Sequence, residues 1–283
     1  MRRMRKSFFS PPGGYLSLTL PGVFLLVGFF ILPLLVVLVT SFIEGKGDAF
    51  LRLLEDPLFY RGLWGSLVLS ISAAFVSLVS GFFIALRMTK LSARVRNFLM
   101  ILISLPLTFS GMVVAYGFIL TFGRAGFFTI LLSFLGVDPA GFSRFIYSPV
   151  GLAFAYCYYL IPRVVFNLLP VLLNFDQRKL LAAESFGAGK FRQIFEILLP
   201  EILPAIVSAF CLVFSVAFGA YGTALALTGT QLNILPLLLY SKISDVGSDF
   251  PLAAALSVVL LSVGSLVMSA GEVFASTRKE MHG

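Results

Sequence analysis

The sequence predicts an all-α, polytopic membrane protein with six transmembrane helices and a helix-turn-helix loop on the cytoplasmic side. Of its 283 residues, 59% are hydrophobic and only 12% are charged, whereas soluble domains carry about 25% charged residues. A helix needs about 20 residues to cross roughly 30 Å of hydrocarbon. Six apolar stretches meet that requirement, over residues 16–42, 63–86, 98–122, 149–173, 201–227 and 251–275.

The distribution of positive charge predicts how these stretches are oriented. With the N-terminus placed in the cytoplasm, 14 of the 21 Lys and Arg residues fall in cytoplasmic segments and six in external ones, while Arg163 lies within the fourth stretch. This positive-inside bias places both termini and residues 176–200 in the cytoplasm. We therefore expect a basic cytoplasmic N-terminus (1–15), a transmembrane domain (16–275) and a cytoplasmic tail (276–283). Because the charges are divided among separate segments, the sequence does not predict nucleic-acid binding.

Local signals within the stretches predict how they pack and where they bend. The third stretch contains Pro106, Gly111 and Gly117, which favour a kink or a local break. Ser148 and Pro149 form a helix start, with a capping residue followed by proline in the first turn. Small residues that allow close helix packing, within this chain or against a second membrane subunit, recur along the second stretch at Ser66, Ser70, Ala73, Ala74, Ser77 and Gly81.

Residue types that carry most metal and catalytic chemistry are scarce. Cys157 and Cys211 fall within apolar stretches, where buried packing is their usual role, and the single histidine is His282. The sequence contains no G-x-x-x-x-G-K-[ST] phosphate-binding motif. We therefore predict a chain that is not an enzyme, with no metal site, no catalytic residue and no cofactor of its own.

The polar segment 176–200, with the sequence DQRKLLAAESFGAGKFRQIFEILLP, is built to meet a soluble partner. Its first half is a good helix former, and the small Ala182 and Ala183 allow its backbone to approach another surface. Gly187 permits the left-handed turn that commonly ends a helix. A second short helix is expected over 190–198, and Pro200 and Pro204 fit the start of the next transmembrane stretch better than its middle.

The spacing in this segment resembles the EAA loop of ATP-binding-cassette (ABC) importer permeases. That pattern reads Glu-Ala-Ala, three residues, Gly, nine residues, Ile, any residue, Leu-Pro. Every element except the first is matched, by Ala182, Ala183, Gly187, Ile197, Leu199 and Pro200. Leu181 replaces the family's Glu, and Glu184, on nearly the same helical face, is the candidate substitute.

The resemblance implies the permease subunit of a type I importer in the bacterial inner membrane, surrounded by lipid. Its loop would sit in a cleft of a cytoplasmic ABC ATPase dimer, which holds the ATP and magnesium. A second permease subunit, with a heterodimer favoured, and a periplasmic or lipid-anchored solute-binding protein complete the implied assembly. A looser similarity covers permeases for polyamines, ferric iron, sulfate and phosphonates. A polyamine-like cargo is slightly favoured, although the external segments carry seven acidic and six basic residues and select no sign of charge.

Arg163 is the one clearly intramembrane charge, and a central arginine costs about 2.5–3.5 kcal/mol on insertion scales. It either faces a hydrated pathway or a subunit interface, or extends along the helix toward the cytoplasmic headgroups. Together with Tyr159 and Tyr221 it forms our candidate translocation pathway.

A stand-alone secondary carrier or channel is the alternative function. Ion-coupled carriers usually hold acidic residues or histidine at mid-membrane depth, and these six stretches carry none there. Uptake driven by ATP, as opposed to an ion gradient alone, distinguishes the importer from the carrier.

Overall fold

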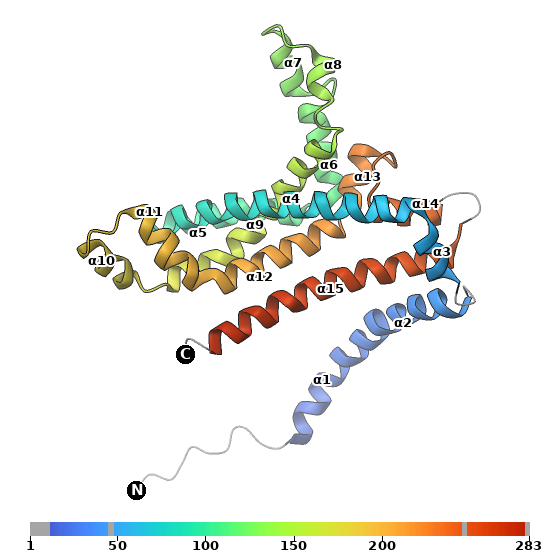
Figure 1. The fold of residues 1–283 in the computed structure, drawn as a ribbon, viewed down its shortest axis with the longest axis horizontal. Coiled ribbons are helices and arrows are strands. Elements are labelled where there is room, and N and C mark those ends of the chain that lie inside the picture. The colour runs from blue at the N-terminus through green and yellow to red at the C-terminus, as the bar shows by residue number, and fades with distance from the viewer. Residues whose placement is uncertain (1–11, 45–47, 245–247, 281–283) are drawn as a thin grey trace.

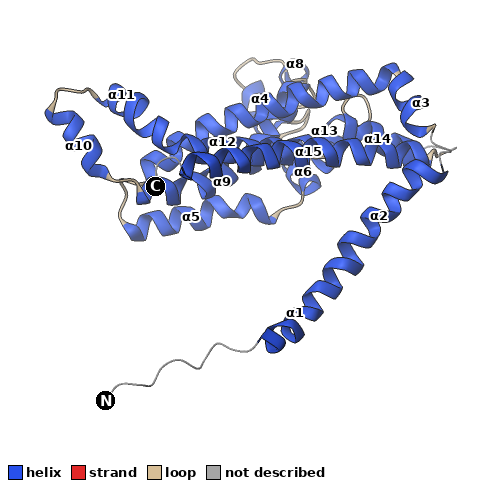
Figure 2. Cartoon of the chain, turned by 60° about the horizontal axis from the view of Figure 1, so that its bottom comes forward, coloured by secondary structure: helices blue, strands red, loops and turns tan. Residues whose placement is uncertain are grey.

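The computed structural model describes residues 12–44, 48–244 and 248–280, and all regular structure within these ranges is helical (Figures 1 and 2). The all-α class is therefore confirmed. Most of the expected N-terminal segment 1–15 lies outside the described residues. Within the described ranges, six helical stretches are long and apolar enough to cross a membrane: Thr19–Phe42, Pro57–Met88, Gly111–Ser133, Pro149–Asn174, Lys190–Phe218 and Phe250–Thr277.

Four long helices form the centre of the bundle. Helix α4 (Pro57–Met88) packs against α9 (Pro149–Asn174) and α12 (Leu199–Phe218), and α12 packs against α15 (Phe250–Glu280). The small residues predicted to allow close packing on α4 are all buried within this chain. Their role is therefore to bring α4 close to its neighbours in the same subunit.

Gly81 marks the tightest of these approaches, and its replacement by valine is expected to destabilise the bundle. A Cβ atom at Gly81 would lie 2.7 Å from the side chain of Val164 on α9. Overpacking of this kind costs about 1–3 kcal/mol of the free energy of unfolding. Thermal unfolding in detergent, followed by size-exclusion fluorescence, should show a Tm lowered by several degrees. Gly264→Val is the control, because a Cβ at Gly264 meets no atom within 4 Å, and an equal loss in both variants would contradict the packing argument.

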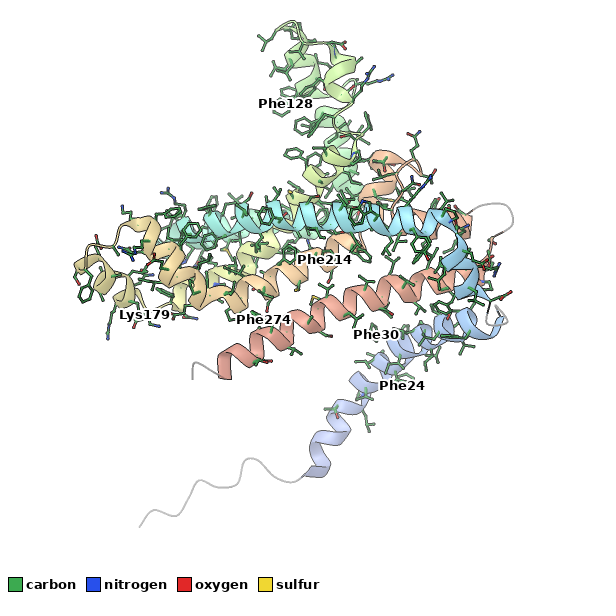
Figure 3. The ribbon with its side chains drawn as sticks, viewed as in Figure 1. Phe24, Phe30, Phe128, Lys179, Phe214 and Phe274 are labelled. Atoms are coloured by element: carbon green, nitrogen blue, oxygen red, sulfur yellow. The ribbon has the colours of Figure 1, made fainter. Side chains whose placement is uncertain are left out.

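The first span leaves the bundle. Helices α1 (Pro12–Leu26) and α2 (Leu32–Val39), joined by the π-helix η1 (Val27–Ile31), run away from α15, and only the end nearest the π-helix η2 (Thr40–Glu44) packs against it (Figure 1). Residues 19–33 are all exposed. Phe24 and Phe30 accordingly extend from this helix without cover from the rest of the chain (Figure 3).

The third predicted stretch, 98–122, is not one continuous helix. Helix α5 (Ala93–Thr108) ends where Phe109 and Ser110 adopt extended backbone, and α6 (Gly111–Phe122) then begins, with the Ser110 hydroxyl accepting a hydrogen bond from the Val113 amide. This is the break that the sequence predicted, but the predicted bounds 98–122 are wrong, because the stretch long enough to cross a membrane is Gly111–Ser133. Figure 1 shows α6 and the short helices α7 (Phe127–Ser133) and α8 (Pro139–Ser143) turning away from the bundle at a steep angle to α4.

The fifth predicted stretch, 201–227, is wrong at both ends. The helix begins at Lys190 and is unbroken to Phe218, through α11 (Lys190–Arg192), the π-helix η3 (Gln193–Leu198) and α12. Pro200 has no amide to donate, and the wide π turn directly before it accommodates that loss. The chain then breaks at residues 219–221 before α13 (Gly222–Thr228).

Short helices and ion pairs close the end of the bundle opposite the 176–200 loop. There, α3 (Ala49–Glu55) and α14 (Leu235–Ser244) lie beside the start of α15 (Figure 1). Arg52 pairs with Asp249 at 2.7 Å and Lys242 with Asp56 at 3.7 Å. These pairs tie together segments from the two ends of the sequence.

Candidate functional site

The 176–200 loop forms a hinged pair of helices at one end of the bundle. Helix α10 (Gln177–Ser185) starts at Asp176, whose carboxylate accepts a hydrogen bond from the Arg178 amide at 3.0 Å. It ends at Gly187, whose φ of +81° lies in the left-handed region. The Ala188 amide donates to the Ala183 carbonyl at 3.0 Å and the Gly187 amide to the Glu184 carbonyl at 2.9 Å. This pair of bonds is the Schellman motif, in which glycine is the favoured residue.

Side-chain contacts fasten the loop to the bundle. The Lys179 ammonium contacts both carboxylate oxygens of Glu201 at 2.8 Å, and the Gln193 side chain donates to the Ala188 carbonyl at 2.9 Å. Lys179 is labelled at this end of the molecule in Figure 3. Ile197 and Leu199 are partly buried against the hydrophobic core. These two members of the EAA pattern therefore anchor the loop and do not belong to its outer surface.

The outer surface of the loop exposes large apolar side chains among polar and charged ones. Ala182, Glu184, Gly187 and Pro200 are exposed, while Ala183 is half-buried. Beside them Phe186 is 90% exposed, Phe191 75% and Leu181 63%. The motif did not point to either phenylalanine. The available signal was the placement of large aromatic residues around a glycine turn in a segment that is otherwise polar.

A cavity of about 220 Å³ lies where the two helix breaks meet, and we call it the break cavity. It gathers all three predicted pathway residues, Tyr159 and Arg163 from α9 and Tyr221 from the break before α13. The complete lining is Pro106, Leu107, Phe109, Gly111, Tyr159, Arg163, Val216, Ala220, Tyr221, Gly222 and Thr223.

Hydrogen bonds hold the two breaks in place around this cavity. The Thr223 hydroxyl donates to the Gly111 carbonyl at 3.1 Å, which joins the start of α6 to α13. The buried Tyr156 hydroxyl donates to the Ala220 carbonyl at 2.9 Å, which joins α9 to the break after α12. Irregular backbone at membrane depth needs such partners. These hydrogen bonds therefore fix the shape of the break cavity.

Arg163 lines the break cavity, and its side chain contacts Tyr159 on the same helix. Its Nη1 atom donates to the Tyr159 carbonyl at 2.6 Å, and its guanidinium carbon lies 5.5 Å from the centre of the Tyr159 ring. Tyr159 is four residues nearer the start of α9, whereas the 176–200 loop follows the end of α9. The guanidinium thus lies toward the start of α9 and not toward the loop end.

The chain forms a bundle of membrane-spanning helices, two of which are broken around a polar cavity. A helical loop is fastened to one end of this bundle. This arrangement is typical of a membrane transport protein. The profile of a protein family described as "Binding-protein-dependent transport system inner membrane component" matches residues 77–279, well over half of the chain. The chain belongs to this family of ABC importer permeases.

Curated relatives cover most of the chain. It is 26% identical over 252 residues to the spermidine/putrescine transport system permease protein PotB of Haemophilus influenzae, with 86% of this chain and 87% of that one covered. PotB of Escherichia coli is 27% identical, with 86% and 91% covered. Sulfate permease 2, a chloroplastic protein of Chlamydomonas reinhardtii, is 28% identical over 239 residues, with 83% and 63% covered.

Among solved structures, a similar fold occurs in a bacterial alginate ABC transporter in complex with its alginate pentasaccharide-bound periplasmic protein. The matching chain has a TM-score of 0.74 at 18% identity, with 91% of this chain and 92% of that chain covered. As a member of the family named above, the protein is a multi-pass inner membrane permease that works with an ABC ATPase and a solute-binding protein. It is not itself an enzyme, and family membership sets aside the stand-alone carrier.

Proposed function

We propose that this permease imports a small charged solute and that the 176–200 loop couples its movement to the ATPase. The loop combines a glycine hinge, exposed aromatic side chains and firm attachment to the bundle, which is what a docking element requires. The observation that carries the proposal is the unbroken helix from Lys190 to Phe218, which runs from the loop to the break cavity.

This helix can transmit force as a rigid lever. It contains 29 residues and is therefore about 40 Å long. In our proposal, closure of the ATPase dimer around ATP and magnesium draws the loops of two permease subunits together. Each lever then moves the break beside its own cavity, and the assembly alternates between inward-facing and outward-facing states. A hinge lies at each end of the lever, at Gly187 and at residues 219–221.

The orientation and the partners follow from the same proposal. The 176–200 loop and both termini lie in the cytoplasm, in agreement with the positive-inside bias. A second permease subunit covers the first span, whose residues 19–33 are exposed in this chain alone. We propose a different permease for that place, because the resemblance is to a group in which single six-span permeases often pair as heterodimers.

The relatives leave the sign of the cargo's charge open. PotB proteins are named for spermidine and putrescine, which are cations, whereas Sulfate permease 2 is named for an anion. Both are similar to this chain at nearly the same identity. The choice between them has to come from the chemistry of the pathway.

Reconstitution tests the proposed function. We expect the chain to co-purify with an ABC ATPase and a second, non-identical permease, as native mass spectrometry would show. In proteoliposomes supplied with the binding protein, uptake should require ATP inside the compartment that contains the ATPase. Collapse of proton and sodium gradients should leave uptake unchanged. Uptake by the isolated chain under an ion gradient would contradict the proposal.

A further inference from the structure

We propose that the cargo is an anion, such as a small sulfate, phosphonate or carboxylate, and that Arg163 contacts it as it crosses the break cavity. This inference rests on the proposed function, because it assigns the chemical class of the solute that the permease moves. Two observations carry it: the charge of the cavity and the unused hydrogen-bond donors of Arg163.

The cavity has one charge, and it is positive. Of the 11 lining residues, Arg163 is the only one that is charged. In the part of the chain that the structure describes, the ion pairs are Arg52–Asp249, Lys179–Glu201, Arg192–Glu196 and Lys242–Asp56, so none involves Arg163. A buried or half-buried guanidinium without a carboxylate favours an anion at its open side.

The guanidinium of Arg163 supplies donors that lack acceptors. A guanidinium has five N–H groups, and the one hydrogen bond described for Arg163 goes to the Tyr159 carbonyl. The Tyr159 side chain is only 8% exposed, and its hydroxyl is buried near that of Thr223, so it is not counted among these donors. A planar guanidinium with unused N–H groups matches the acceptor oxygens of an oxyanion.

Helix ends of both signs line the cavity. Gly111, the first residue of the 12-residue helix α6, lines the cavity. A helix N-terminus carries partial positive charge, and half-helix N-termini in broken membrane helices commonly face anionic groups of a solute. The last turns of α5 and α12, with Pro106, Leu107 and Val216, line the same cavity and carry partial negative charge, so the charge of Arg163, and not the helix ends, carries the inference.

A polyamine would meet the opposite chemistry. Its ammonium groups are donors only, and they would face a fixed positive charge with no carboxylate among the lining residues. Cation transport along this side of the pathway would require acidic side chains from the second subunit that outweigh Arg163. That arrangement is the competing outcome of the experiments below.

Charge-selective labelling tests the cavity without knowledge of the cargo. Cys157 and Cys211 are first replaced by alanine, and Tyr221→Cys is introduced at the cavity. The full complex is then treated with an anionic sulfonatoethyl or a cationic trimethylammonioethyl methanethiosulfonate. After correction for their rates with free thiol, the anionic reagent should react at least tenfold faster, and Arg163→Gln should remove that preference. An equal or faster rate for the cationic reagent overturns the inference.

Transport then tests the role of Arg163. Proteoliposomes with ATPase and binding protein are offered sulfate, methylphosphonate, putrescine and spermidine. We expect ATP-dependent anion uptake, lowered at least tenfold by Arg163→Gln and less by Arg163→Lys, while the complex still assembles. Arg124→Gln, a change of an exposed arginine outside the cavity, should transport like the wild type.

The outcomes separate the two levels of the proposal. ATP-dependent uptake of putrescine or spermidine that survives Arg163→Gln overturns the anionic cargo and leaves the importer function standing. Uptake that needs no ATP overturns the proposed function itself.

Discussion

Replacing Gly187 by valine is expected to uncouple ATP hydrolysis from transport. The native φ of Gly187 is +81°, and a Cβ there meets no atom within 4 Å, so the whole penalty is conformational. A left-handed conformation costs a residue with a Cβ about 1–2 kcal/mol, and β-branched residues avoid it most strongly. Valine should therefore open the Schellman turn and misplace α10 relative to the lever.

The measurement is the ratio of solute moved to ATP hydrolysed in reconstituted complexes. We expect Gly187→Val to lower this ratio at least tenfold while the transmembrane bundle stays folded. Gly189→Val is the matched control, because Gly189 is also exposed and unobstructed but has a φ of −66°. Equal coupling in the two variants would show that the left-handed turn has no part in the mechanism.

The second large effect is expected at the tip of the loop, where Phe186→Asp should weaken ATPase binding. Burial of a phenylalanine side chain contributes about 1.5–3 kcal/mol, which corresponds to roughly a tenfold to hundredfold change in affinity. Since Phe186 is 90% exposed in the chain alone, the change should leave folding intact. The measurement is the Kd of the ATPase for permease held in nanodiscs.

Two other variants define what that result means. Gln177→Asp adds the same charge to the exposed start of α10, where a helix tolerates it, and should keep the wild-type Kd. Glu184→Ala tests whether this exposed carboxylate replaces the glutamate that Leu181 displaced from the EAA pattern. An unchanged Kd for Phe186→Asp would place the docking surface elsewhere on the loop.

Features that are set by residues close together in the sequence could be predicted from it. The six spans follow from apolar runs of sufficient length, and the break near Gly111 from proline and glycine. The fifth span was predicted less well, because Pro200 and Pro204 favoured a separate start at 201. In the structure a π turn absorbs the missing amide of Pro200, and the helix continues through both prolines. That tolerance depends on packing around the helix and is not visible in the spacing of residues.

By itself, the sequence determined an all-helical membrane protein with six spans and a glycine turn in its polar loop, because span length and backbone conformation are set within a few residues. Only the tertiary structure decided that Tyr159, Arg163 and Tyr221 share one cavity. Tyr156 and Ala220 are 64 residues apart, yet their hydrogen bond helps to bring the second break against α9. Such a juxtaposition depends on how helices pack, and no local pattern encodes it.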